Sequence, residues 1–153
     1  MTIEAKLVEL KCSLPPPPRP GGVYQSLLEV GTYAYFSGHL PRRSDGSLMT
    51  GRVGEEVDLE GGHVAARQAA LCVLATAKHA LRSLDRITRV VKLFGMVNCT
   101  ADFTRHPQVI NGSSELFRDL WGPDLGMGVR SAVGVHSLPS NVSVEIEGVF
   151  LID

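Results

Sequence analysis

The chain has 153 residues, of which 44% are apolar and 20% charged, and its formal net charge is −1. This composition is typical of a single globular domain with a substantial core, and it excludes a disordered or collagen-like chain. A charge so close to zero also argues against nucleic acid or an anionic membrane as the main partner.

The N-terminal sequence MTIEAKLVELK lacks the apolar core of a signal peptide, and no apolar run approaches the roughly 20 residues of a membrane-spanning helix. We therefore expect a cytoplasmic protein with no membrane partner. The three cysteines, Cys12, Cys72 and Cys99, are too widely spaced for a disulfide framework or a zinc cluster, and they are expected to be buried apolar residues.

We expect one domain over residues 1–153, in which residues 1–20 supply an N-terminal strand and a proline-rich arm. The four consecutive prolines of PPPPRP, residues 15–20, favour polyproline II and exclude both a helix and strand pairing. The arm is therefore predicted to be a stiff surface segment.

Strand-forming residues at 23–30 and 33–40 flank the pair Gly31-Thr32, a pattern that predicts a hairpin. Residues 41–58 contain two turn pairs that end in glycine, and they are predicted to be a loop with room for a short strand.

An alanine-rich segment predicts a long helix from Gly61 to Leu84, and the β-branched run at 87–99 predicts a central strand. A second helix is predicted between Pro107, which suits a first helical turn, and the stop signal Gly122-Pro123.

Two strands are predicted at 130–137 and 142–151, joined by a turn at LPSN. In the second strand, apolar residues alternate with Ser143, Glu145 and Glu147, which is typical of a half-buried strand. The whole order predicts an α+β fold, a mixed sheet with two helices on one face. The other face of the sheet has no helix to pack on it. Self-association is the simplest way to shield that face from water.

The sequence contains no motif that predicts a metal ion or a cofactor. Its five histidines form no pair at metal-ligand spacing, and no glycine-rich phosphate loop follows a predicted strand. Ser37 lacks the G-x-S-x-G surroundings of a hydrolase nucleophile.

Five polar residues occupy positions that ask for an explanation: Tyr24, Asn111, Arg130, Glu145 and Glu147. Arg130 follows the glycine-rich GMGV and precedes an apolar run, so it stands at the start of a predicted strand. A guanidinium in that position can bind an anion. It can equally pair with a carboxylate on a neighbouring strand, and Glu145 can simply face water. The residues alone leave both interpretations open.

The C-terminal run GVRSAVGVHSLPSNVSVEIEGVF resembles the signature of the YjgF/Rid family, the reactive-intermediate deaminases, also known as L-PSP endoribonucleases. GVYQSLLEVGTYAYFSGHLP is similar to the N-terminal hairpin of that family, and VINGSSELF to its second-helix motif. The resemblance covers about residues 22–152, and the proline-rich entry and the loop at 41–58 match a longer branch of the family. Ala132 departs from the cysteine that the family often has there.

The resemblance implies a chorismate-mutase-like fold and a homotrimer, with the sheets inside, the helices outside and ligand clefts between subunits. It also implies hydrolytic deamination of enamine and imine intermediates (2-imino acids) to 2-oxo acids and ammonia, with no cofactor. Arg130 would clamp the substrate carboxylate and Glu145 would orient water. The remaining substrate-binding residues that the resemblance implies are Tyr24, Ser37, Gly38 and Asn111.

A symmetric hairpin around residues 138–141 would place Val149 opposite Arg130. Glu145 would then lie on the same sheet face, about 13 Å from Arg130 along the strand. A slip of one residue would move Glu145 to the opposite face.

Two other functions stay open. The same clefts can belong to a non-catalytic trimeric protein that binds or senses a small carboxylate. The second is the endoribonuclease activity, and its only support in the sequence is one local basic cluster, Arg86, Arg89 and Lys92. The near-neutral net charge of the chain argues against RNA binding.

Overall fold

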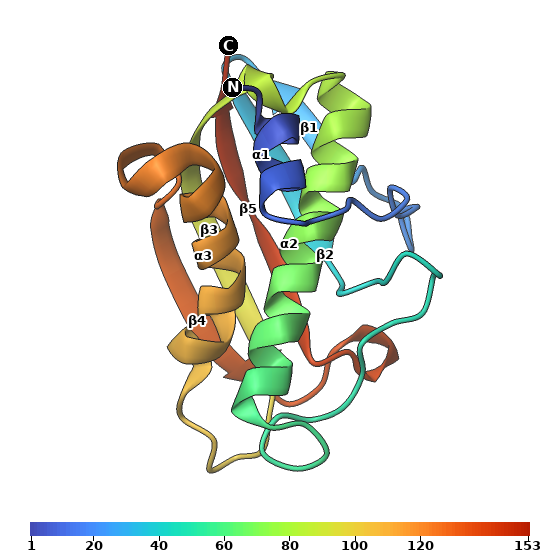
Figure 1. Ribbon diagram of the computed structural model, residues 1–153. Coiled ribbons are helices and arrows are strands. Elements are labelled where there is room, and N and C mark those ends of the chain that lie inside the picture. The colour runs from blue at the N-terminus through green and yellow to red at the C-terminus, as the bar shows by residue number, and fades with distance from the viewer.

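The computed structural model describes residues 1–153 as a mixed α+β fold with one five-stranded sheet and three α-helices (Figure 1). The elements in chain order are α1 (Ile3–Glu9), β1 (Leu27–Val30), β2 (Tyr33–His39), α2 (Leu59–Leu81), the 3-10 turn η1 (Leu84–Arg86), β3 (Ile87–Asn98), α3 (His106–Leu125), β4 (Val129–Val135), the 3-10 turn η2 (Pro139–Asn141) and β5 (Val144–Ile152). None of these helices has the length and apolar character that crossing a membrane requires.

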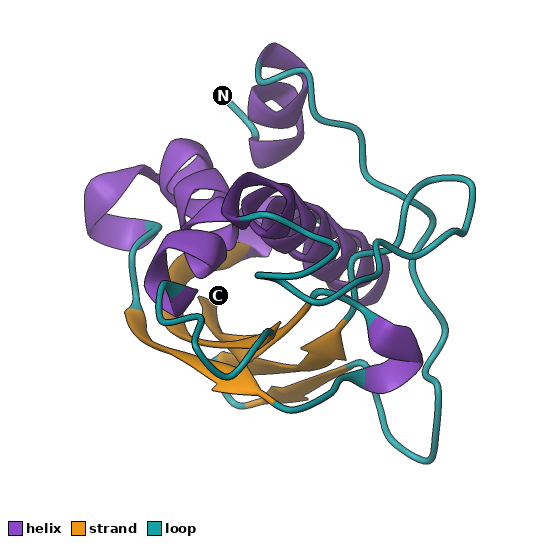
Figure 2. Ribbon diagram, turned by 90° about the horizontal axis from the view of Figure 1, so that it is seen from below, coloured by secondary structure: helices purple, strands orange, loops and turns teal.

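The strands follow the order β1-β2-β5-β3-β4, and only the β3–β4 pair is parallel. Figure 2 shows the two layers, with α2 and α3 packed on one face of the sheet and α1 on the outer side of the helices. The prediction of a mixed sheet with two long helices on one face is therefore confirmed. The opposite face of the sheet carries no helix.

The predicted N-terminal strand is wrong, because residues 3–9 form α1. The Thr2 side chain caps this helix by accepting a hydrogen bond from the Ala5 amide at 3.1 Å. Ile3 and Leu7, four residues apart, lie on one side of the helix and join the core. Their spacing is helical, so the signal was present in the sequence.

The two long helices lie where the sequence predicts them, with shifted ends. α2 begins at Leu59 because the Asp58 carboxylate accepts a hydrogen bond from the Gly61 amide at 2.7 Å. It ends at Leu81 because Arg82 adopts a left-handed backbone with φ of 72°. The predicted hairpin is also confirmed, with the two-residue turn at Gly31-Thr32.

The last two predicted strands are present, but they do not pair as the symmetric hairpin would require, because β3 lies between β4 and β5. Arg130 pairs with Leu93 of β3, whose partner on the other side is Gly148 and not Val149. The β3–α3–β4 segment is a parallel crossover, which leaves β5 to pair with the free edge of β3. The connection at residues 136–143 is long enough to span the roughly 10 Å between two strands that flank a third.

The core lies between the helices and the sheet and contains Phe117, Phe150, Leu74 and Ile146, all fully buried. Strand pairing places a different set of apolar residues on the helix-free face. Exposed members of that set are Leu28, Val30, Tyr33, Tyr35, Val129 and Val133. We call this surface the open face.

Candidate functional site

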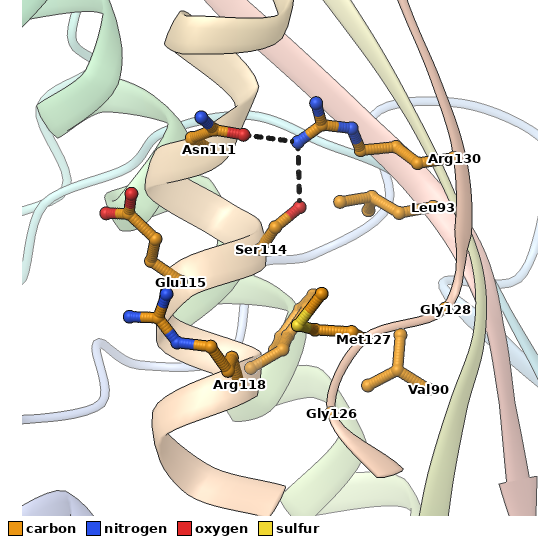
Figure 3. A pocket seen from close by; sticks show the side chains of 11 residues that line it. Val90, Leu93, Asn111, Ser114, Glu115, Arg118, Gly126, Met127, Gly128 and Arg130 are labelled. Atoms are coloured by element: carbon orange, nitrogen blue, oxygen red, sulfur yellow. Dashed lines mark hydrogen bonds between the residues drawn. The ribbon is translucent and has the colours of Figure 1, made fainter. Parts of the chain in front are cut away.

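Arg130 lies on β4, the edge strand, and its side chain points to the helix side of the sheet because its neighbour in the register, Leu93, is a core residue. Its guanidinium is held by α3. Nη1 donates to Asn111 Oδ1 at 2.8 Å and to Ser114 Oγ at 3.1 Å (Figure 3). Nη2 donates to the Pro107 carbonyl at 3.4 Å. An arginine has five N–H donors, so the Nε–H and one Nη2–H are left for a ligand.

A cavity of about 340 Å³ lies beside this guanidinium, between α3 and the start of β4. Its apolar wall consists of Val90, Leu93, Phe117 and Met127. Gly128 passes so close to the carbonyls of Val90 and Val91 that a side chain there would overlap them. The glycine-rich approach to Arg130 is therefore required by the packing of the chain against β3.

Burial lowers the pKa of Arg130. A guanidinium keeps its proton in proteins, so the residue remains a cation whose charge is only partly solvated. Such a cation has a strong tendency to bind an anion that fits the cavity.

Glu145 lies at the start of β5 and points to the open face, because its neighbours Val144 and Ile146 are buried on the helix side. A Cβ atom at Gly38 would overlap the Glu145 carboxylate, so glycine at position 38 is what leaves room for it. Burial raises the pKa of Glu145, and the nearby charge of Glu147 raises it further.

The Glu145 carboxylate lines a second cavity, of about 610 Å³, together with Tyr24, Ser37 and Gly38. The Tyr24 hydroxyl accepts a hydrogen bond from the Gly21 amide at 3.0 Å. The Ser37 hydroxyl donates to the Gln25 carbonyl, so it ties β2 to the segment before β1. The Ser37 side chain therefore supports the wall of the cavity.

His39 follows Gly38 and is buried between the sheet and α2. Its Nδ1–H donates to the Ser37 carbonyl at 2.6 Å, and its Nε2 accepts from the Thr76 hydroxyl at 2.8 Å. Burial lowers the pKa of His39, which agrees with a neutral ring. The ring holds the backbone at the irregular part of β2, between Phe36 and His39.

A family model described as "YjgF/chorismate_mutase-like, putative endoribonuclease" matches residues 4–144 of the chain. The chain belongs to this YjgF family. The predicted resemblance is thereby confirmed.

Three relatives illustrate how closely other YjgF-like proteins match. Protein TCP17 of Trypanosoma cruzi is 38% identical over 145 residues, which cover 95% of this chain and 91% of that protein. The structure of Atu1372 from Agrobacterium tumefaciens, of unknown function, is 40% identical with a TM-score of 0.90, covering 99% of this chain and 94% of that one. A "putative endoribonuclease" from Shewanella oneidensis MR-1 is 27% identical with a TM-score of 0.94, covering 99% and 100%.

In this YjgF protein the predicted site residues form two groups. Arg130 and Asn111 meet at the edge of the sheet on the helix side, and Tyr24, Ser37, Gly38 and Glu145 line one cavity on the other side. We call these the arginine half-site and the glutamate half-site. Of the two registers that the sequence leaves open, the structure has the one that places Arg130 and Glu145 on opposite faces, because β3 separates their strands and shifts the register by one residue.

Sequence reasoning missed several lining residues of the YjgF chain. Ser114 follows Asn111 by three residues, a helical spacing that could have indicated it. His39, next to Gly38, could have been found from its position alone. Arg19 and Arg42 come from the arm and from a loop, and no local pattern places them in a cavity. No group of three or more His, Cys, Asp or Glu side chains is gathered where it could hold a metal ion.

Proposed function

We propose that this chain hydrolyses 2-imino acids to 2-oxo acids and ammonia, in sites assembled between the subunits of a homotrimer. One observation carries the proposal: the arginine and glutamate half-sites lie on opposite faces of one sheet. A small ligand cannot touch both half-sites of one chain. The β4 edge of one subunit, placed against the open face of the next, would bring them together. Such head-to-tail contacts close into a ring of three when each subunit is rotated by about 120° from the last.

The open face supports this association. It carries exposed apolar side chains on three of its five strands, among them Leu28, Tyr35, Val129 and Val133. Contiguous apolar surface of this kind marks an interaction site in a globular protein. The homotrimer with the sheets inside is therefore part of the proposal.

The arginine half-site suits a carboxylate. Asn111 and Ser114 hold Nη1 of Arg130, so the guanidinium is oriented before the ligand arrives. The free Nε–H and Nη2–H can donate to the two oxygens of one carboxylate, an arrangement that is both strong and specific. The 2-carboxylate of an imino acid is the group that we assign to Arg130.

The glutamate half-site suits the activation of water. Glu145 of the partner subunit would take a proton from a water molecule as the water oxygen bonds to C2 of the protonated imine. The carboxyl group would then give this proton to the nitrogen. Ammonia leaves as the C–N bond breaks, and the new hydroxyl loses its proton to solvent and becomes the carbonyl of the 2-oxo acid. Burial raises the pKa of Glu145 above its ordinary value, which makes the carboxylate a stronger base for the first transfer.

The test is a coupled assay in which threonine dehydratase releases the reactive intermediate and the appearance of 2-oxobutanoate is followed. The wild-type chain should accelerate this step, and Arg130→Ala should abolish the acceleration. Arg43→Ala, which removes an exposed arginine outside both half-sites, should act like the wild type. The proposal is wrong if the wild type gives no faster appearance than Arg130→Ala.

The alternative of binding without turnover is supported by Ala132, which leaves the strand after Arg130 without the thiol that the family often has. It predicts binding of 2-oxobutanoate in calorimetry, lost in Arg130→Ala, with no acceleration in the coupled assay. The endoribonuclease description of the relatives has less support, because Arg86 is already engaged in ion pairs with Glu29 at 3.2 Å and Asp153 at 3.7 Å.

A further inference from the structure

The glutamate half-site contains two arginines that the proposed reaction does not use. Arg19 comes from the proline-rich arm and Arg42 from the segment after β2, and both line the cavity that holds Glu145 and Glu147. Neither belongs to any of the four ion pairs of the chain. Arg42 Nη1 donates to the Gly46 carbonyl at 2.7 Å, and Arg19 has no hydrogen-bond partner in the chain. Most of their donors are free.

The backbone of Arg42 is fixed by hydrogen bonds, and that of Arg19 follows a stiff proline segment. The Arg42 carbonyl accepts hydrogen bonds from Gln68 Nε2 at 2.7 Å and from the Cys72 thiol at 3.2 Å, which fix it to α2. Arg19 follows a run of prolines whose first member, Pro15, is buried, and Pro18 itself lines the cavity. A polyproline segment is stiff, so little additional ordering is needed when Arg19 binds a ligand.

The two arginines do not neutralise the glutamates. Neither guanidinium forms an ion pair with the carboxylate of Glu145 or Glu147. The cavity therefore has an acidic side and a basic side. Only two of its fourteen lining residues are hydrophobic, which makes it a poor site for an apolar side chain. A doubly charged phosphate would be repelled by the two glutamates, whereas a single carboxylate fits the basic side.

We infer that Arg19 and Arg42 form a subsite for a second carboxylate, so that the chain prefers dicarboxylic 2-imino and 2-oxo acids. This inference rests on the proposed function, in which Arg130 of the partner subunit binds the 2-carboxylate and Glu145 faces C2. The distal carboxylate then reaches the basic side of the cavity. The proline-rich arm, which the reaction itself does not require, determines specificity.

Calorimetry with two five-carbon acids tests the subsite. 2-Oxoglutarate and 2-oxopentanoate share the 2-oxo acid group and differ in the distal carboxylate. We expect the wild type to bind 2-oxoglutarate at least tenfold more tightly. Arg19→Gln and Arg42→Gln should each lose most of this preference and bind 2-oxopentanoate as the wild type does, and the matched variant Arg43→Gln should keep the preference.

Equal affinity of the wild type for the two acids would overturn the subsite, and so would a preference that survives in both Arg19→Gln and Arg42→Gln. In either case binding of 2-oxopentanoate that is lost in Arg130→Gln leaves the proposed function intact. If the wild type binds neither acid and does not accelerate the coupled assay, the proposed function and the subsite are both wrong.

Discussion

Arg130 is a cation and Glu145 an anion when ionised, and burial destabilises the ionised form of each side chain. It lowers the pKa of Arg130, which still remains a cation, and it raises the pKa of Glu145, where the shift changes the chemistry. An ordinary glutamate is too weak a base to take a proton from water efficiently at neutral pH. Burial and Glu147 together make Glu145 a stronger one.

Glu145→Gln should lower kcat by about 10²–10⁴-fold, the usual contribution of a general base, and should leave the affinity for 2-oxobutanoate close to that of the wild type. The variant should also be more stable at pH 8. The folded state raises the pKa of Glu145, so ionising this group above its unfolded pKa destabilises the wild type but not the variant. Thermal unfolding at pH 8 and pH 4 checks this, since the difference should vanish at the lower pH.

His39 should make stability depend on pH in the opposite sense. The ring is 3% exposed and its pKa is lowered from 6.5, so below about pH 6.5 the unfolded chain binds a proton that the folded chain resists. The free energy of unfolding should therefore fall as the pH drops from 7 to 5. His39→Asn, whose amide can still donate to the Ser37 carbonyl, should lose this part of the pH dependence in urea titrations. An unchanged slope would contradict the neutral, buried ring.

At the scale of elements, the helices α2 and α3 approach each other closely where they cross. Small residues form this interface, and a Cβ atom at Gly112 would overlap the His63 carbonyl of α2. Ser113 Oγ donates across the same crossing to the Ala66 carbonyl. Because α3 carries Asn111 next to Gly112, the helix spacing also sets where the anchor of Arg130 lies.

Gly112→Ala should force the two helices apart and reduce stability by about 1–3 kcal/mol, since overpacking against a rigid backbone cannot relax through a side chain. In a chain of this size that corresponds to a fall in Tm of at least about 2 °C. Gly21→Ala is the matched control, because its Cβ would meet only the Tyr24 hydroxyl at an ordinary 3.8 Å. Equal Tm values for both variants would show that the helices tolerate the added methyl group.

For the whole molecule, the proposed trimer depends on the open face, which would bring the two half-sites of neighbouring subunits together. Tyr35 lies on this face, where it pairs with Leu28 on one side and Val149 on the other, and it remains 47% exposed in the single chain. A residue so exposed contributes little to the stability of one subunit. Its burial is expected only on assembly.

Tyr35→Asp should prevent the proposed trimer from forming, so that the variant sediments as a monomer and lacks the proposed turnover, while each chain stays folded by circular dichroism. The reason is that a carboxylate cannot be buried unpaired in an apolar interface. Val64→Asp on α2 is almost equally exposed, at 49%, and lies away from the open face, so it should remain trimeric and active. A wild-type chain that sediments as a monomer would remove the basis for the composite site.

The sequence predicted the elements whose signals are local. The Gly31-Thr32 turn, the alanine-rich α2, the β-branched β3 and the Pro107 start of the second helix are all found in the structure, with ends shifted by a few residues. The pairing of Arg130 with Asn111 could be expected only from the family resemblance, since nothing local relates β4 to α3. The predicted N-terminal strand is wrong because Ile3 and Leu7 have the four-residue spacing of a helix and are both buried on one side of α1.

By itself the sequence determined which segments are helical or extended, which family the chain resembles, and which polar residues need a role. Only the tertiary structure decided that β3 lies between β4 and β5, and hence that Arg130 and Glu145 face opposite ways. Side chains alternate along a strand, so a difference of one residue in a long-range register reverses the face. That register depends on which strands pair, and strand pairing is set by packing over the whole chain.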